Sequence, residues 1–259
     1  MDAAALIALG IAVGLLMGLT GSSGVALTVP ALSYMGYTYQ RSVGVSLFVD
    51  FLSSLTTLAV YLKAKDVDGR YALALGAGAV LGAQLGSHVA VRTPEPPLEV
   101  LFALSSLYFA YTSLKNGMSG SDRGLAPTVR SIVLTLRPRA RRALLLASSV
   151  GVGVLTGLIG ASGGIMFMVI ISALSDMPIR KTVGTATASM ALSALSGFLA
   201  YSYLAKIDLS ASVVIGASAL VSGYMSARLA HEVPQRYLYF ALAALFAVVA
   251  ALELIRAFA

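Results

Sequence analysis

The pattern Gly-x-Ser-Gly occurs twice in this chain, and each copy lies in the middle of an apolar stretch longer than one membrane span. The first copy is Gly21-Ser22-Ser23-Gly24, within residues 3–36. The second is Gly160-Ala161-Ser162-Gly163, followed by Gly164, within residues 141–175. Glycine and serine at such depth interrupt a helix and expose backbone N–H groups, which hydrocarbon tolerates only where protein or a wet cavity satisfies them. Two such breaks in matching parts of one chain are the best sequence indication of a transporter's binding site.

The composition indicates a polytopic α-helical membrane protein. Apolar residues make up 58% of the chain and charged residues only 11%, about half the charged share of a typical soluble protein. Several apolar runs reach the roughly 20 residues that cross a bilayer, and these runs are continuous, which argues against a β-barrel. The chain has no cysteine and two histidines far apart, so we expect no disulfide, no metal site and no cofactor. The net charge of +7 implies no nucleic-acid partner, because basic residues of membrane proteins gather in cytoplasmic loops.

The chain is an internal duplication. A shift of 139 positions places Gly14, Leu16, Gly18, Leu19, Gly21, Ser23 and Gly24 on identical residues within 153–163. After one inserted residue the shift is 140, and Arg41-Ser42-Val43-Gly44 then matches Lys181-Thr182-Val183-Gly184. Single residues farther along also match, namely Tyr61, Asp68, Gly76 and Pro94 with Tyr201, Asp208, Gly216 and Pro234. One insertion aligns nearly the whole length, so chance is a poor explanation.

Each half is predicted to contain one interrupted, V-shaped helical element followed by three full spans. The predicted spans are 41–63, 70–91 and 97–115 in the first half, and 182–204, 209–229 and 236–256 in the second. The predicted organisation is a first repeat over residues 1–115, a basic cytoplasmic linker over 116–140, and a second repeat over 141–259. The fold class is therefore an all-α membrane protein built from two repeats.

The positions of the 18 Lys and Arg residues favour inverted repeats. If each broken element crossed the membrane, the side of the central linker would hold twelve of these residues and the other side six. If each broken element instead returns to its own side, the split is fourteen to four. The positive-inside rule prefers the second arrangement. We therefore expect a multi-pass protein of the cell membrane with a cytoplasmic central loop, both termini outside, and halves related by an in-plane pseudo-two-fold axis.

The two breaks are the predicted substrate site. The half-helices that follow them, residues 24–34 and 164–175, would point their N-termini into the protein, with unsatisfied N–H groups and roughly half a positive charge. An anion binds at such a place without a full cationic side chain. Hydroxyl groups add donors and caps, and glycine lets a ligand approach the backbone. The predicted site residues are Gly21, Ser22, Ser23, Gly24, Gly160, Ala161, Ser162, Gly163 and Gly164. Gly14, Gly18, Gly153 and Gly157 are interpreted as helix-packing positions.

Polar side chains in the spans extend this prediction. Ser46, Thr185 and Thr187 lie near the starts of the spans that follow the breaks, and Gln84 is a candidate donor in the pathway. Such hydroxyls also serve merely to cross-link helices. Asp50 is the one acid expected well inside a span, and an intramembrane carboxylate is by default a functional candidate. It is predicted to carry a coupling ion, a proton first, because burial favours the neutral acid. Its counterpart is Met190, so it lies outside the duplicated plan.

The duplicated Gly-x-x-x-Gly-Leu-x-Gly-x-Ser-Gly block resembles the TauE/SafE family of membrane permeases. The Arg/Lys-x-Val-Gly step and the glycine-rich third span of each half resemble it too, over about 240 residues in all. The resemblance implies export of sulfur-containing anions such as sulfite, sulfoacetate and related organosulfonates, without an ATPase and with coupling to an ion gradient. It implies an anion site on residues 21–24 and 160–164. The sequence departs from the family pattern at Asp50, and the two half-sites differ, because Val25 stands where the second copy has Gly164.

Two other functions remain open at this point. An uncoupled anion channel would share the same composition. A rhomboid-type intramembrane serine protease would use Ser162 as nucleophile with His88 or His231 as its base, but that chemistry needs one serine and one histidine rather than a duplicated motif. The expected partners of a permease are a small anion and the lipid bilayer, and the Gly- and Ala-rich helix faces make a homodimer plausible.

Overall fold

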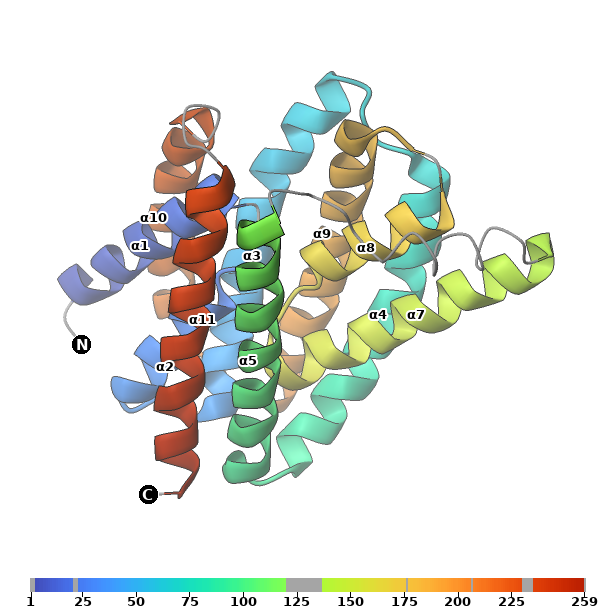
Figure 1. Ribbon diagram of the computed structural model, residues 1–259. Coiled ribbons are helices and arrows are strands. Elements are labelled where there is room, and N and C mark those ends of the chain that lie inside the picture. Colours follow the sequence, from blue (N-terminus) through green and yellow to red (C-terminus); the bar gives the residue numbers. More distant parts are fainter. Residues whose placement is uncertain are drawn as a thin grey trace.

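The computed structural model describes residues 3–20, 23–119, 137–175, 177–205, 207–229 and 235–258, and this part of the chain is helical throughout its regular elements (Figure 1). The first half contains α1 (Ala3–Thr20), α2 (Val25–Tyr34), α3 (Tyr39–Lys63), α4 (Gly69–Arg92) and α5 (Glu95–Ser119). The second half contains α7 (Pro138–Ile159), α8 (Gly164–Leu174), α9 (Ile179–Leu204), α10 (Leu209–Leu229) and α11 (Gln235–Phe258). Both breaks fall where the sequence predicts them, and α5 and α7 extend into the predicted linker from its two ends.

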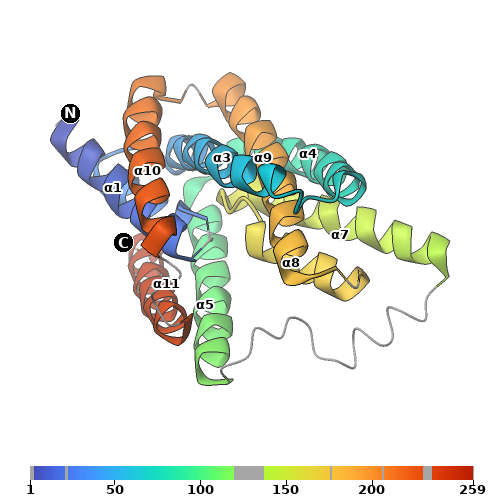
Figure 2. The same ribbon diagram turned by 90° about the horizontal axis from the view of Figure 1, so that it is seen from above.

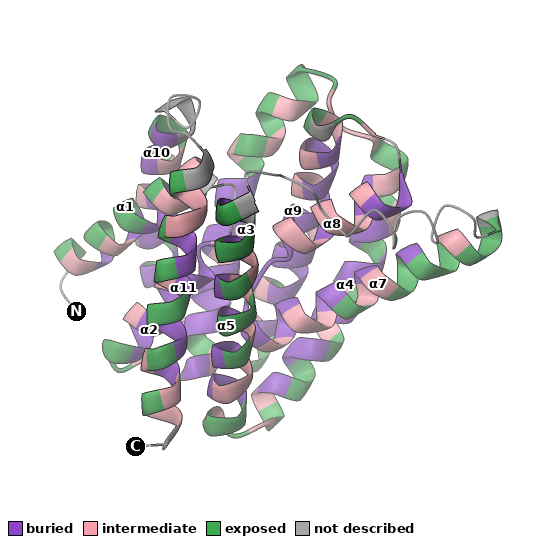
Figure 3. Cartoon of the chain, viewed as in Figure 1, coloured by how far each residue is buried: buried purple, intermediate pink, exposed green. Residues whose placement is uncertain are grey.

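Seven of these helices are long and apolar enough to cross a membrane: α3, α4, α5, α7, α9, α10 and α11. The apolar part of α1, together with α2 and α8, is shorter. Large apolar side chains are exposed on the outside of the bundle, for example Leu81, Leu85 and Val89 on α4, whereas buried residues lie between the helices (Figure 3). An exposed apolar surface of this extent belongs in lipid. The prediction of an all-helical polytopic membrane protein is confirmed.

The two halves pack crosswise, each first helix lying on the opposite half. Helix α1 packs on α10, and α7 packs on α4. Helices α3 and α9 contact each other in the centre, between these two pairs (Figure 2). Helix α5 packs on α11. If each helix of one half is replaced by its counterpart in the other half, the same set of main helix contacts results.

Small residues make the crosswise contacts close. A Cβ on Gly14 of α1 would lie 2.2 Å from the carbonyl oxygen of Ala219 on α10. A Cβ on Gly153 of α7 would likewise lie 2.3 Å from the oxygen of Ala79, and one on Gly157 would lie 2.4 Å from that of Ala83, both on α4. The glycines therefore let the backbones touch, as small-residue motifs do in membranes, and the packing interpretation of these three positions is confirmed.

Polar turns fix where the long helices begin. Asp68 caps α4 by accepting hydrogen bonds from the N–H groups of Arg70 and Tyr71 at 3.1 and 3.2 Å. Its repeat counterpart Asp208 accepts one from the N–H of Ala211 at 3.0 Å. Each carboxylate accepts hydrogen bonds from N–H groups that a helix start leaves unpaired. The duplicated acids therefore fix where α4 and α10 begin.

Candidate functional site

The first break leads directly to a carboxylate on α3. Gly24 is the N-cap of α2, and its N–H donates to Oδ1 of Asp50 at 2.9 Å. The hydroxyl of Ser23 donates to Oδ2 of the same carboxylate and accepts from the N–H of Val25 at 3.3 Å. A Cβ on Gly24 would lie 3.3 Å from Oδ1 of Asp50 and 2.5 Å from Val13. Glycine is therefore what allows this helix end to approach the acid.

The second break is an extended segment between two left-handed glycines. Gly160 ends α7 with φ +76°, and Gly163 begins α8 with φ +80°, a backbone region that favours glycine. The hydroxyl of Thr156 on α7 donates to the carbonyl oxygen of Ala161 at 2.9 Å and so links the segment to α7. No side chain caps α8, so the expected capping role of Ser162 is wrong.

Ser162 instead reaches the same acid as the first break. Its hydroxyl donates to Oδ2 of Asp50 at 2.6 Å, and its backbone N–H also bonds to this carboxylate. Both Asp50 and Ser162 have no exposed surface. Two motifs that are 139 positions apart in the sequence thus converge on one buried carboxylate, which accepts hydrogen bonds from both of them.

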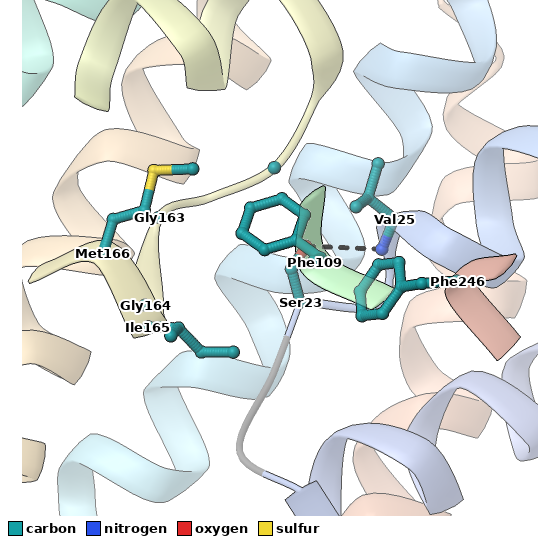
Figure 4. A pocket seen from close by; sticks show the side chains of 9 residues that line it. Ser23, Val25, Phe109, Gly163, Gly164, Ile165, Met166 and Phe246 are labelled. Carbon is teal, nitrogen blue, oxygen red and sulfur yellow. Dashed lines mark hydrogen bonds between the residues drawn. The ribbon is translucent and has the colours of Figure 1, made fainter. Parts of the chain in front are cut away.

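A small pocket opens beside this centre, between the two breaks (Figure 4). It encloses about 360 Å³ with its open mouth included. Its lining comes from the first break, the second break, and one aromatic side chain each from α5 and α11: Ser23, Val25, Ala161, Gly163, Gly164, Ile165, Met166, Phe109 and Phe246. The rings of Phe109 and Phe246 pack 5.5 Å apart and form an apolar wall opposite the start of α8 (Figure 4).

The start of α8 supplies the pocket with hydrogen-bond donors. The first hydrogen bond that closes a turn of this helix runs from the N–H of Phe167 to the oxygen of Gly163, at 2.8 Å. The N–H groups of Gly164, Ile165 and Met166 precede it and have no acceptor within the helix. All three residues line the pocket. The dipole of the helix adds partial positive charge at the same end, so the pocket offers an anion both donors and a favourable potential.

The structure places the other predicted residues in different surroundings. Ser46 lies one turn before Asp50 on α3, buried, with no hydrogen-bond partner for its hydroxyl in the described part of the chain. Gln84 donates to the backbone oxygen and hydroxyl of Ser196 at 2.9 and 3.0 Å and so links α4 to α9. Thr185 donates to the oxygen of Lys181 and accepts from the N–H of Asp68.

Three further positions complete this comparison. The hydroxyl of Thr187 bonds to the oxygen of Val183 in its own helix. Gly21 and Ser22 lie outside the described residues. Of all the predicted residues, those that lie together at Asp50 or in the pocket are Ser23, Gly24, Ala161, Ser162, Gly163 and Gly164.

The one histidine that the structure describes, His88, is not hydrogen-bonded to Ser162. His88 is exposed, and its Nδ1 lies 2.8 Å from the backbone oxygen of Gln84. His231 lies outside the described residues. The hydroxyl of Ser162 donates to a carboxylate instead of a ring nitrogen, and a serine nucleophile needs a general base at that position.

Asp50 lies well inside α3, as predicted, but two further acids near helix ends are also buried among the described residues. Glu99 on α5 and Glu253 on α11 are 4% and 1% exposed. They lie close to helix ends, where an acid is ordinarily solvated, so hydropathy alone did not mark them. Glu253 and Arg256 are three residues apart and therefore share one face of a helix. This spacing is the sequence signal that could have indicated a group of charged side chains there.

Sequence comparison agrees with the geometry of a membrane transporter. The profile of the sulfite exporter TauE/SafE family matches residues 6–252. Curated relatives are described as probable membrane transporter proteins. MJ0441 of Methanocaldococcus jannaschii is 24% identical over 208 residues, which cover 76% of this chain and 71% of that protein. YunE of Bacillus subtilis is 25% identical over 212 residues, covering 76% of this chain and 77% of that protein.

A shorter match has higher identity. YdhB of Bacillus subtilis is 30% identical over 106 residues, which cover 41% of this chain and less than half, 43%, of that protein. No solved structure matches the chain. The family profile spans both breaks, Asp50, six of the long apolar helices and most of the seventh, α11. By this match the chain belongs to the TauE/SafE family of membrane transporters.

Proposed function

We propose that the protein is a secondary transporter that exports small sulfur-containing anions, such as sulfite, sulfoacetate or related organosulfonates, in a process coupled to protons. The observation that carries this proposal is the convergence of both helix breaks on Asp50, next to a pocket that ends on the first turn of α8. The family resemblance supports the substrate class.

The pocket suits an anion with a small carbon skeleton. A sulfonate or sulfite oxygen would accept from the N–H groups of Gly164, Ile165 and Met166, as oxyanions do at helix N-termini. An organic tail would lie against Phe109 and Phe246, whose rings form the apolar side of the same pocket. Free donors on one side and an apolar wall on the other match the two ends of an organosulfonate.

Asp50 would couple this binding to a proton. As a carboxylate it accepts the hydrogen bonds of Ser23, Gly24 and Ser162, and its charge repels an anion in the adjacent pocket. A proton on Asp50 removes the charge and releases hydroxyl donors for the substrate. Proton and anion therefore bind together, and each is expected to strengthen the binding of the other.

The charge of such a complex favours export. A dianion that travels with one proton carries one net negative charge. An inside-negative membrane potential drives one such charge outward with about 2.3 kcal/mol per 100 mV. A higher concentration of the anion inside the cell than outside would add to this driving force. Export would then require no ATP hydrolysis.

The helix directions support inverted repeats that rock around this site. Helices α5 and α11 lie side by side and run in opposite directions, and α3 and α9 also enter from opposite ends of the bundle (Figure 1). Helix α5 ends and α9 begins at the same end, so the α7–α8 element returns toward the side from which it came (Figure 1). We place the protein in the cell membrane with the central loop in the cytoplasm and both termini outside, as the basic residues favour.

A binding experiment at several pH values tests the proposal. Purified protein would be titrated calorimetrically with sulfoacetate, sulfate and thiosulfate, which stay dianions near neutral pH, and with taurine, which carries no net charge there. Wild-type affinity for the dianions is expected to rise as the pH falls. In Asp50→Asn, which resembles the neutral acid, affinity is expected to be high and independent of pH.

Flux measurements separate a coupled transporter from the alternatives. Reconstituted wild-type protein should move anions with saturation and with a dependence on the proton gradient, and Asp50→Asn should lose that dependence. Flux that neither saturates nor responds to the gradient would identify a channel. Equal pH dependence of binding in the wild type and Asp50→Asn would remove Asp50 from the mechanism.

A further inference from the structure

A second group of charged side chains is buried where α3, α5 and α11 meet, well away from the pocket. Glu99 of α5 and Glu253 of α11 are 4% and 1% exposed. Arg256 of α11 forms an ion pair with Glu99 at 3.3 Å and a longer contact with Glu95 at 3.9 Å. Tyr39, fully buried at the start of α3, interacts electrostatically with both Glu99 and Glu253.

The hydrogen bonds of this group are incomplete. Neither carboxylate oxygen of Glu253 has a partner among the described residues, and the same is true of the Tyr39 hydroxyl and of Nη1 of Arg256. Arg256 is already paired with Glu99. Of the two buried carboxylates, Glu99 therefore has the guanidinium as its ion-pair partner, whereas Glu253 has no ion pair or hydrogen bond among the described residues.

The charged groups that act on Glu253 are Glu99 of α5 and Arg256 of α11. The buried hydroxyl of Tyr39 on α3 interacts with Glu253 as well, and Tyr201 of α9 interacts with Tyr39. An ionised carboxylate without a partner costs several kcal/mol in such a place. A proton removes this cost in the simplest way, and the described residues contain no group of three acids or histidines that could hold a metal ion.

The duplicated architecture does not require these charges. The positions that correspond to Glu99, Glu253 and Arg256 in the other half are Tyr239, Ser113 and Asn116. The α5–α11 pair thus has an uncharged set of residues at one end and a charged, buried set at the other. The charged set is therefore not part of the duplicated plan and calls for another explanation.

We propose that Glu253 is a second proton-binding site of this protein, separate from Asp50, with the Glu99–Arg256 ion pair beside it. Tyr39 and Asp50 are eleven residues apart on α3, about 16 Å along the helix, so the two acids do not share donors. The side chains of Glu95 and Arg256 are 33% and 28% exposed, which gives the site a route to water at this end of the bundle. The site binds its proton whichever anion the pocket accepts.

Infrared difference spectroscopy on the intact protein tests the proposal. A protonated carboxylic acid has a carbonyl band that a carboxylate lacks. At neutral pH, without added anion, the wild type is expected to show this band, and Glu253→Gln is expected to lose it. Asp50→Asn and Glu95→Gln should keep it. In Glu99→Gln, Glu253 becomes the carboxylate that pairs with Arg256, so the band should disappear although Glu253 is still present.

Thermal unfolding in detergent gives a second readout. Glutamine has the shape of a neutral glutamic acid, so Glu253→Gln should unfold close to the wild-type temperature at neutral pH. A large loss of stability would show instead that Glu253 is an ionised structural partner of Arg256, and it would overturn the proposal. An unchanged band in Glu253→Gln, or a sodium-dependent stabilisation that this variant loses, would overturn it too. None of these results for Glu253 depends on whether the pocket binds an anion, so the proposed transport function can fail separately.

Discussion

Asp50 occupies the place that a substrate anion would take at the two breaks. Its carboxylate accepts from a hydroxyl and an N–H of the first break, and from Ser162 of the second. Hydrogen bonds to a charged acceptor contribute more than neutral ones, about 1.5–3 kcal/mol each. Asp50 therefore ties up donors of both breaks, which are the donors that we propose for the substrate.

The Ser162 hydroxyl should therefore matter for binding beyond its role in packing. Ser162→Ala is expected to weaken dianion binding by roughly tenfold, since one charge-assisted hydrogen bond of about 1.4 kcal/mol is lost. Ser149→Ala is the matched control, because Ser149 is also fully buried but bonds only to Leu146 in its own helix. Calorimetric titration with sulfoacetate measures both. Equal affinities in the two variants would place the anion elsewhere.

At the scale of single residues, about half of the site could be predicted from the sequence. The local rule that glycine and serine break a membrane helix located Ser23, Gly24, Ser162 and Gly163. Their convergence on Asp50 depends on how α3 lies against both breaks, and no local pattern encodes that. Gln84 has the chemistry of a substrate donor, yet it is bonded to Ser196, because only the packing of α4 on α9 decides where its amide points.

Among the elements, the α7–α8 break is the most constrained. Two glycines with positive φ enclose Ala161 and Ser162, and Thr156 holds the segment through the oxygen of Ala161. The break thus has one defined conformation, which keeps Ser162 on Asp50 and leaves the first turn of α8 open to the pocket.

Substitution of Gly163 tests this constraint. Gly163→Ala is expected to lower thermal stability, because a left-handed conformation costs an L-residue about 1–2 kcal/mol and the new Cβ would lie 2.5 Å from Val152. Gly160→Ala should cost less, since its closest contact is 3.1 Å, to Val43. Gly151→Ala is the control. Gly151 lies within α7 with open space around it, so alanine should be neutral or stabilising there, by up to about 1 kcal/mol.

The helix boundaries followed from the sequence almost completely. The apolar runs predicted the long helices. The internal duplication predicted that Asp68 and Asp208 stand at equivalent helix starts. The acids of α5 and α11 were missed because Glu99 and Glu253 stand near helix ends, where sequence alone does not distinguish a buried side chain from a solvated one. Their burial is created by the neighbouring helix, since α5 and α11 cover each other along their length.

Across the whole molecule, polar contacts between loops join the two halves. The hydroxyl of Tyr37, between α2 and α3, donates to Asp208 at 2.8 Å, between α9 and α10. In the other direction, Lys181 at the start of α9 lies 3.5 Å from Asp68. Hydrogen bonds from Ser210 and Ala211, with a smaller contribution from Tyr37, lower the pKa of Asp208 to about 2. Burial and the bond to Asp208 raise the pKa of Tyr37 to about 12.

Acid stability should depend on Asp208. Because its folded pKa of about 2 is below the ordinary 3.8, the unfolded chain takes up this proton first. The stabilisation is complete above about pH 4 and is lost as the pH falls toward 2. Asp208→Asn should remove this part of the pH dependence of thermal unfolding. Tyr37→Phe should retain most of it, since the bonds from Ser210 and Ala211 remain. Identical acid profiles in Asp208→Asn and the wild type would contradict the assignment.

Neither half is expected to fold alone, because α1 and α7 each pack on the opposite half. Residues 1–119 and 137–259 expressed as two chains should assemble when produced together, and each should be degraded or aggregate when produced singly. Co-purification through a tag on one fragment measures the assembly. Stable, monomeric single fragments would show that the crosswise packing is dispensable.

This crosswise packing also bears on how such a chain could arise. A half-length ancestor would have exposed the glycine-lined face of its first helix, and a second copy of itself would have covered that face. The inverted arrangement that we propose would require the two copies to enter the membrane in opposite orientations. Fusion would then fix one orientation for each half. After that, the two halves could diverge, so that an acid could appear in one half while methionine occupies the matching position in the other, as at Asp50 and Met190.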